Sequence, residues 1–424
     1  MAELFGFSIT RSKNEKATSQ DFTLPSVDDG SQTVIGGGGH IGHYLDIEGQ
    51  IRDEADLIRR YREVAMQPEC DQAVEDIVNE AIVSDEIEPP VRLNLDRIKP
   101  FSIDLKKKIA KEFDEVLRLL EFEEKGHDIF RRWYVDGRMY YHKVIDPKNP
   151  KDGIRELRYI DPRKIKKVRE IKKKDGPIKM PGDAPDPMEY KEYYVYNEKG
   201  VGGSMNTGGI RIHKDAIAYC PSGLVDQQKN VVLSHLHKAI KPVNQLRMIE
   251  DSLVIYRISR APERRIFYID VGNLPKIKAE QYLKDVMNRY RNKLVYDAST
   301  GEIRDDRQYM SMLEDFWLPR REGGRGTEIT TLPGGQNLGE IDDIKYFQKK
   351  LYQSLNVPFS RLDSEAAGGL QLGKSTEVSR DEIKFTKYIQ RLRKKFIHLF
   401  SDMLKTQLIL KGIVSEDDWA SVSD

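Results

Sequence analysis

The segment His235–Ser259, HLHKAIKPVNQLRMIEDSLVIYRIS, decides how the chain is arranged. Its apolar residues recur at helical spacing: Val243, Leu246, Ile249, Leu253 and Tyr256. A helix of about 20 residues is a rod of roughly 30 Å. Ala261-Pro262 then ends the pattern. The sequence therefore predicts a long helix near the middle of the chain.

A second helix is predicted from Ile341 to Leu355, where Asn356-Val357-Pro358 stops it. Between the two helices, residues 263–275 (ERRIFYIDVGNLP) predict a strand and Lys276–Asn292 an amphipathic helix. Residues 294–304 (LVYDASTGEIR) predict a hairpin. Two helices thus bracket a small α/β insert, which predicts a stalk that carries a tip.

The flanking segments predict a larger α+β unit. Residues 1–45 are polar and glycine-rich, which is typical of a flexible arm, and helical patterns follow up to Leu120. From Ile129 to Tyr219 the pattern is strand-like, as in residues 131–145 (RRWYVDGRMYYHKVI). Four aromatic residues of that stretch are expected to alternate along a strand and form core: Trp133, Tyr134, Tyr140 and Tyr141. After a glycine-bearing loop, residues 359–377, a long basic helix runs to Leu410. The predicted fold class is multidomain α+β.

Composition limits the functional classes. The 424 residues exceed what one hydrophobic core usually supports, and 33% of them are charged. The net charge is only +1, because 70 basic residues oppose 69 acidic ones, so a simple basic nucleic-acid coat is excluded. The charge is segregated, since Arg380–Lys411 holds nine Lys/Arg against three Asp/Glu. Such patches favour self-association or a charged partner, although any one of them can be a solvated face.

Targeting and redox signals are absent from the sequence. Cys70 and Cys220 have no metal-ligand spacing and form no disulfide framework, which predicts a reduced setting. The first residues lack the apolar core of a signal peptide, and no run of 18 apolar residues occurs. We therefore expect a protein made in the cytosol, with no membrane span.

Residues 368–375, GGLQLGKS, match the phosphate-binding pattern G-x-x-x-x-G-K-[ST]. In that role Lys374 would contact phosphates and Ser375 a magnesium ion. The motif requires a buried strand before it, but residues 360–367 (SRLDSEAA) are polar. This favours a mobile glycine-rich loop that ends at a helix cap near Ser379–Glu382.

Other candidates for catalysis are weaker. His40 and His43 have no third metal ligand nearby in sequence. Asp305 and Asp306 are adjacent rather than facing, as paired catalytic carboxylates would be. No Ser-His-Asp or Cys-His arrangement can be argued, so the sequence predicts no catalytic site, metal or cofactor.

Several unusual strings resemble the portal vertex protein family of T-even-type tailed bacteriophages. They are FRRWYVD at 130–136, KVIDPK at 143–148, YRI at 256–258, RAPERR at 260–265, VYDASTG at 295–301 and MSMLED at 310–315. The resemblance extends from about residue 45 to 420. It implies a portal-type architecture: a non-enzymatic ring, usually of twelve subunits, at one capsid vertex of the virion.

The resemblance divides the chain into the parts of a portal subunit. These are an arm (1–45), a wing (46–237), two stem helices (238–261 and 336–357), a clip (262–335), a channel loop (358–378) and a long helix returning to the wing (379–424). The family continues into a crown of further helices, whereas this sequence ends at Asp424, so most of the crown is expected to be absent.

The same resemblance implies sites and partners. The channel loop would face DNA through Gly368, Gly369, Gln371, Gly373 and Lys374. The stem would line the channel with mixed charge from Glu250, Asp251, Lys349 and Lys350. Clip contacts are expected at Arg304, Arg307, Arg320 and Arg321, because arginine is favoured at interfaces.

Expected partners are further copies of the chain, the major capsid protein, the large terminase, neck or adaptor proteins and double-stranded DNA bound without sequence preference. Assembly is expected in the host bacterial cytoplasm. Two alternatives stay open: a DNA-packaging ATPase that uses residues 368–375, and a monomeric head–tail adaptor.

Overall fold

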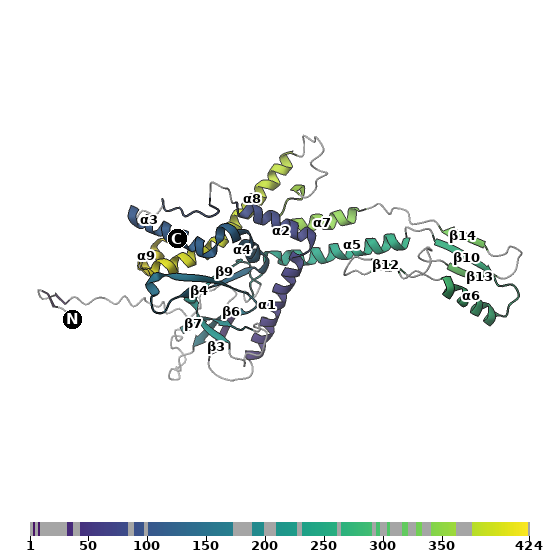
Figure 1. The fold of residues 1–424 in the computed structure, drawn as a ribbon, viewed down its shortest axis with the longest axis horizontal. Coiled ribbons are helices and arrows are strands. Elements are labelled where there is room, and N and C mark those ends of the chain that lie inside the picture. Colours follow the sequence, from purple (N-terminus) through teal and green to yellow (C-terminus); the bar gives the residue numbers. More distant parts are fainter. Residues whose placement is uncertain are drawn as a thin grey trace, which may run out of the picture. The chain divides into compact units, whose positions relative to one another are not determined.

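The computed structural model forms two compact units, Met1–His237 with Gly368–Asp424 (unit 1) and Lys238–Ala367 (unit 2) (Figure 1). It describes residues 3–4, 7–8, 32–36, 43–83, 89–96, 101–172, 189–198, 209–226, 231–260, 264–290, 294–296, 303–305, 316–320, 328–332, 341–361 and 375–422. Most of the predicted arm, residues 1–45, lies outside these ranges. Unit 1 is built from two separate stretches of sequence, and unit 2 lies between them in the chain.

Four helices open the well-described part of unit 1. They are α1 (His43–Ala65), α2 (Pro68–Ala81), α3 (Ile103–Leu120) and α4 (Phe122–Asp136). Pro68 begins α2, where its missing N–H costs nothing. The Ser102 hydroxyl accepts a hydrogen bond from the Leu105 N–H (3.3 Å) and caps α3. Glu121, in the left-handed conformation, separates α3 from α4.

Two small sheets accompany these helices. In the first, β4 (Arg138–Ile145) lies between β5 (Ile154–Ile160) and β9 (Ile217–Pro221), all antiparallel. The second has the order β3 (Gln32–Gly36), β6 (Ile165–Lys172), β7 (Glu189–Tyr196) and β8 (Ile210–His213), with only β3 and β6 parallel. A further pair joins β1 (Glu3–Leu4) and β2 (Phe7–Ser8). The α+β class predicted from the sequence is confirmed at this level.

One predicted strand is wrong. Residues 129–136 belong to α4, so Trp133 and Tyr134 lie on a helix while Tyr140 and Tyr141 lie on β4. All four side chains are buried, as predicted. Gly137, with φ of +71°, ends the helix and starts the strand. Aromatic residues favour strands only weakly, and burial of the α4 face against the rest of the core overrides that preference.

Helix α8 (Ser375–Leu410) completes the core of unit 1 and is followed by α9 (Glu416–Val422). The Phe396 ring lies 5.1 Å from Phe130 and 5.3 Å from Trp133, measured between ring centroids. Because α8 begins at Ser375, the predicted cap at Ser379–Glu382 is wrong: those residues lie inside the helix.

Polar contacts fix the C-terminal half of α8. The Lys143 ammonium on β4, almost fully buried, contacts Asp402 on α8 at 3.0 Å. The Ile154 N–H at the start of β5 donates to Gln407 at 2.7 Å. The Lys143 ammonium and the Ile154 N–H are shielded from water, so losing either partner would leave a buried donor unsatisfied.

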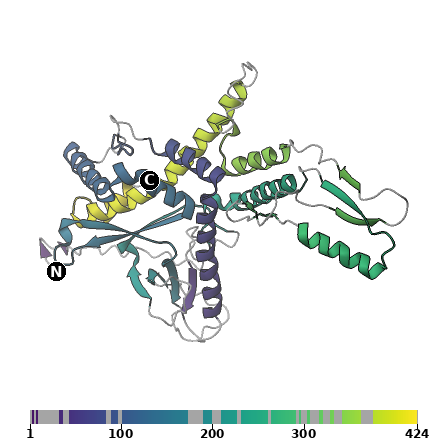
Figure 2. The same cartoon turned by 45° about the vertical axis from the view of Figure 1, so that its right-hand side comes forward.

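Unit 2 contains the two predicted stalk helices, α5 (Ile240–Arg260) and α7 (Asp342–Leu355), which lie side by side (Figures 1 and 2). A 3₁₀ turn, His235–Ala239, precedes α5, so the α-helix starts five residues later than predicted. Pro242 explains the start, because proline is tolerated only in the first turn. Asn356 in the left-handed conformation ends α7, and a 3₁₀ turn, Phe359–Arg361, follows.

The segment between these helices forms the predicted α/β insert. Strand β10 (Arg264–Asp270) lies between β13 (Phe316–Arg320), which is parallel to it, and β14 (Glu328–Leu332), which is antiparallel. Helix α6 (Lys276–Tyr290) contributes Ala279 to a small core with Ile269 and Val271. Strands β11 (Leu294–Tyr296) and β12 (Ile303–Asp305) form the predicted hairpin.

Candidate functional site

The predicted channel residues lie on the α5–α7 pair. Glu250 and Asp251 are half-buried on α5, whereas Lys349 and Lys350 are exposed on α7. The Lys350 ammonium lies 5.6 Å from the centre of the Phe347 ring, within cation–π range. The pair therefore carries both signs of charge within a few turns of helix.

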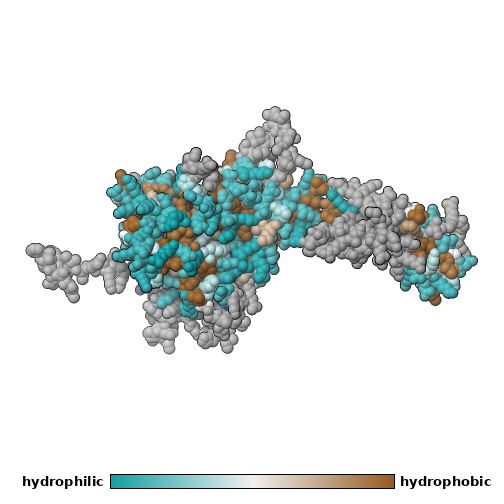
Figure 3. All heavy atoms as spheres, in the orientation of Figure 1, coloured by the Kyte–Doolittle hydropathy of each residue, from teal (hydrophilic) through white to brown (hydrophobic). Residues whose placement is uncertain are grey.

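Helix α5 also exposes apolar side chains. Val243 and Leu246 are buried, but Met248 and Ile255, on the opposite side of the helix, are 63% and 50% exposed. Tyr256 next to them is 45% exposed. A helix with apolar residues all round is normally covered on every side. Figure 3 shows brown, apolar residues at the surface of unit 2 among the hydrophilic ones.

Of the four predicted clip arginines, Arg320 is described with its side chain. Its guanidinium bonds the Glu328 carboxylate at 2.8 Å and lies 5.9 Å from the centre of the Tyr268 ring. Arg320 on β13 thus reaches across β10 to β14, and both partners stay 40–49% exposed. Arg304 lies on β12, described by its backbone only, and Arg307 and Arg321 lie outside the described residues.

The five predicted loop residues, Gly368, Gly369, Gln371, Gly373 and Lys374, also lie outside the described residues. The described chain before them is helix α7 and the turn Phe359–Arg361, and Ser375 begins α8. A phosphate-binding loop needs a strand at its entrance. The described residues on the N-terminal side of this segment, which end at Arg361, are helical.

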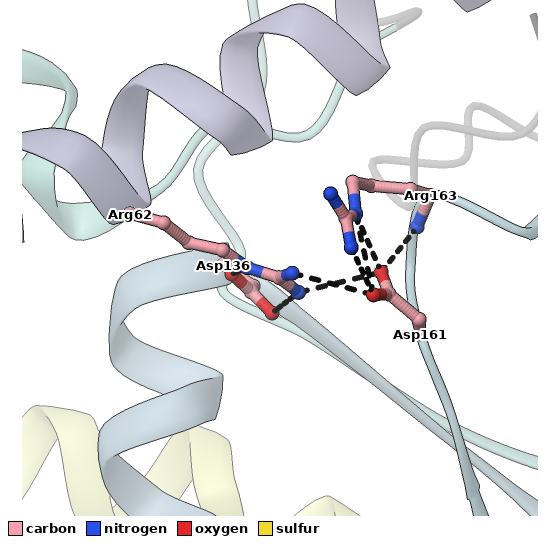
Figure 4. Close-up of polar contacts among 4 residues, drawn as sticks. All are labelled: Arg62, Asp136, Asp161 and Arg163. Carbon is pink, nitrogen blue, oxygen red and sulfur yellow. Dashed lines mark hydrogen bonds and ion pairs between the residues drawn. The ribbon is translucent and has the colours of Figure 1, made fainter. Parts of the chain in front are cut away.

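Sequence reasoning missed an ionic cluster in unit 1 (Figure 4). Arg62 on α1 donates to both Asp136 oxygens, at 2.8 and 2.7 Å, and to both Asp161 oxygens at 3.3 Å. Arg163 donates to Asp161 from its side chain at 2.7 Å and from its backbone at 3.0 Å. Two arginines and two aspartates thus join α1, the end of α4 and the β5–β6 turn.

The opposite charges in this cluster shift the pKa values of its members. Burial alone would raise the pKa of Asp161, but hydrogen bonds from Arg163 and Arg62 outweigh it and hold that pKa well below its usual range. The hydrogen bond to Asp136 raises the pKa of Arg62. A hollow of about 430 Å³ opens beside them. Its other lining residues are Ala65, Met66, Asp128, Arg131, Arg132, Val135 and Tyr159.

A second missed cluster is more deeply buried. The Glu54 carboxylate on α1 lies 2.9 Å from the Lys166 ammonium and 3.4 Å from the Arg138 guanidinium. All three side chains are less than 10% exposed. Burial lowers the pKa of Lys166, and the Glu54 carboxylate opposes that shift. The cluster ties α1 to both sheets, which is a structural role.

Both cysteines and His235 are in inert settings. Burial raises the pKa of both thiols, Cys70 and Cys220, to about 12, so neither is a nucleophile at neutral pH. Burial also lowers the pKa of His235 to about 4, which keeps its ring neutral. Among the described residues, no three potential ligands gather to hold a metal ion, and no helix has the length and apolar character of a membrane span.

Comparison with known proteins identifies the family. The model of the bacteriophage T4-like portal protein family (Gp20) matches residues 54–424. The portal protein of Vibrio phage KVP40 is 43% identical over 426 residues, covering 96% of this chain and 81% of that protein. The portal protein of Salmonella phage ViI is 38% identical over 410 residues, covering 93% and 72%. A chain of the solved structure "Neck of native GTA particle computed with C12 symmetry" covers 84% of this chain at 14% identity, with 81% of its own length matched and a TM-score of 0.43. The chain therefore belongs to the T4-like bacteriophage portal protein family.

Proposed function

We propose that this portal protein works as one subunit of a closed ring, usually of twelve copies, at one vertex of the phage capsid. Double-stranded DNA passes through the ring during packaging and ejection. The role is structural, and no enzymatic step is assigned to the chain. In support, the described residues that precede residues 368–375, up to Arg361, are helical and include none of the strand that enters a nucleotide-binding loop.

Within the ring, α5 and α7 are the stem and the strands β10, β13 and β14 with α6 are the clip. Unit 1 is the wing. The loop that faces DNA is the segment predicted at 358–378, and it ends where α8 begins at Ser375. Strong cationic contacts would grip the phosphates and slow translocation. The acidic residues of α5 and the lysines of α7 support a channel of mixed charge instead.

The clip is proposed to bind the large terminase during packaging and the neck proteins afterwards, while the wing contacts the major capsid protein. Arg304, Arg307, Arg320 and Arg321 are the proposed clip contacts. Arg320 supports this, because its pair with Glu328 holds an exposed guanidinium in a fixed position. The ring would assemble in the host cytoplasm and remain at the capsid vertex of the virion.

The observation that best supports a ring is the exposed apolar side of α5, which we call its outer side. Met248 and Ile255 lie seven residues apart on one side, both at least half exposed. Burying such side chains stabilises an assembly by roughly 1.5–3 kcal/mol each. A neighbouring subunit that covers this side in every copy gives a repeated interface, and a repeated heterologous interface that closes makes a ring.

The experiment is the mass of the purified protein by light scattering, with negative-stain electron microscopy. Wild type should give rings with a central hole. Ile255→Glu places a charge in the proposed interface, and we expect the ring mass to fall towards that of a monomer. Ile103→Glu is the matched control, since Ile103 is 75% exposed at the start of α3, where a carboxylate is tolerated.

The two variants separate the outcomes. Rings in the control and monomers in Ile255→Glu, both folded by circular dichroism, support the proposal. Rings of normal mass in Ile255→Glu would show that α5 is not at the interface. If the wild-type protein is monomeric at all concentrations, the result would instead favour the alternative function, a monomeric head–tail adaptor.

A further inference from the structure

Helix α8 is the long yellow helix in Figures 1 and 2. Along the middle of its length it buries one narrow side. The buried residues alternate four and three positions apart: Phe385, Ile389, Leu392, Phe396 and Leu399. That spacing keeps them on one line, against the core of unit 1. The other side of the helix is therefore free to carry a different pattern.

A line of basic residues runs along the opposite side. Its members, which we call the α8 basic line, are Lys384, Lys387, Arg391, Lys394 and His398. All five are exposed. They alternate three and four residues apart, like the buried line. Between Ile383 and Ser401 the sequence contains no acidic residue. Like charges at this spacing repel one another within a helix.

Little inside the chain balances these charges. Lys384 pairs with Asp381 at 2.9 Å, and Arg391 lies 5.8 Å from the centre of the Tyr388 ring. Lys387 and Lys394 make no ion pair with any residue that the structure describes. The line thus keeps most of its positive charge facing solvent.

The helix that carries the line is held rigidly. Arg393, on its flank, donates to the backbone carbonyls of Ala81 (2.9 Å) and Glu80 (2.6 Å) at the end of α2. The alkyl chain of Lys395 lies where a side chain on Gly223 would be, about 3.1 Å from its Cβ position. The cations are therefore displayed on a fixed rod rather than on a flexible segment.

We propose that the α8 basic line binds the phosphate backbone of double-stranded DNA without sequence preference. From Lys384 to His398 the line rises about 21 Å at 1.5 Å per residue. Phosphates of one strand are 3.4 Å apart along a duplex, so several lie within reach of the line. Phosphate contacts of this kind position a duplex and read no bases.

DNA fits this surface better than a second protein does. The cores of protein interfaces are depleted in lysine and enriched in aromatic residues. Two of the five residues that face outwards here are lysines without partners among the described residues, and none of the five is Tyr, Trp or Phe. The site belongs to unit 1, whereas the α5–α7 pair that was proposed to line the channel belongs to unit 2.

The test measures binding of the full-length protein to a labelled 30-base-pair duplex of mixed sequence, by fluorescence anisotropy at several salt concentrations. Lys387→Gln/Arg391→Gln/Lys394→Gln removes three charges from the line. Lys148→Gln/Lys151→Gln/Lys214→Gln removes three exposed lysines elsewhere on unit 1 and is the control. Each lost phosphate contact should reduce the slope of log K against log salt by about 1, so the line variant should lose about 3.

At low salt we expect the line variant to bind at least tenfold more weakly than wild type and the control variant. The oligomeric mass is measured on the same samples. Weaker binding with a shallower slope, at unchanged mass and helicity, supports the proposal. Equal loss in both variants, or no loss, overturns it. Loss of the ring in the line variant with DNA binding retained would assign the line to a contact between subunits instead.

Discussion

Arg62 shows how single residues hold unit 1 together. Its guanidinium meets two carboxylates that are 74 and 99 residues away in the sequence. Asp136 is only 3% exposed, so its charge depends on Arg62 for balance. Removing one partner of a buried pair leaves the other charge unbalanced, which costs more than the pair contributes.

Arg62→Ala should therefore lower the free energy of unfolding by about 3 kcal/mol, measured by urea denaturation at pH 7. Arg118→Ala is the control, because Arg118 also bonds a carboxylate, Glu115, but on the exposed surface of α3. The control should move the urea midpoint little, since exposed pairs are screened by solvent. Equal effects would show that the Arg62 cluster adds no more than a surface pair.

The same pair of variants has a pH signature. The folded pKa of Asp161 is lowered, so its contribution to stability is present above the ordinary pKa of about 3.9 and is lost as the pH falls further. The difference between wild type and Arg62→Ala should accordingly shrink below about pH 4. An unchanged difference there would place the stabilisation outside this carboxylate.

At the scale of elements, Gly137 fixes the change from α4 to β4. Its φ of +71° is left-handed, and a Cβ there would lie 2.7 Å from the Leu233 carbonyl and the Ser234 Cα. The chain therefore turns from helix to strand directly against the segment that leads to α5. A side chain at this position strains the backbone and displaces that segment.

Gly137→Ala should destabilise the protein by about 3 kcal/mol, from unfavourable backbone conformation and the close approach together. Gly412→Ala separates the two causes. Gly412 has φ of +67°, but nothing lies within 4 Å of its Cβ position, so about 1 kcal/mol is expected from conformation alone. Thermal unfolding followed by circular dichroism measures both. Equal shifts would contradict a steric role for Leu233 and Ser234.

Sequence patterns predicted the elements in which a regular apolar spacing continues over many residues. The α5 and α7 helices, the strand at 264–270 and the hairpin at 294–305 were all predicted within a few residues, because their apolar residues recur in the sequence at the spacing of a helix or a strand. The stretch 129–136 was misassigned, because its aromatic residues suit a strand locally while the helix face is chosen by tertiary burial.

The sites were harder to predict than the elements. The cluster of Arg62, Asp136 and Asp161 left no pattern, because its members come from three elements and meet only in the fold. The predicted loop residues Gly368–Lys374 lie outside the described residues, so their role stays a prediction. Arg320 was selected by residue type alone, which gave no sign of its bond to Glu328.

For the whole molecule, the near balance of 70 basic and 69 acidic residues suits pairing between subunits. The charges are unevenly distributed along the chain, so acidic and basic surfaces of neighbouring copies can face each other in a ring. Salt screens such contacts, with a Debye length of about 10 Å at 0.1 M and about 3 Å at 1 M.

Ring assembly should therefore weaken with salt. Between 0.1 and 1 M sodium chloride we expect the protein concentration needed for half-assembly to rise, measured by light scattering over a dilution series. Circular dichroism at each salt concentration checks that the subunits stay folded. Rings that persist unchanged at 1 M would mean that apolar surfaces, such as the outer side of α5, dominate the assembly.

The sequence of unit 2 is inserted within that of unit 1, and this determines the order in which the parts of the core are synthesised. The rings of Phe130 and Trp133 emerge from the ribosome about 260 residues before Phe396, against which they come to rest. At 5–20 residues per second that interval is roughly 13–50 seconds, during which both rings lack their contact with Phe396. Unit 2 is complete in sequence before unit 1 and can fold while unit 1 waits. The side of α4 that packs against α8 therefore stays uncovered by it until the last long helix has been synthesised.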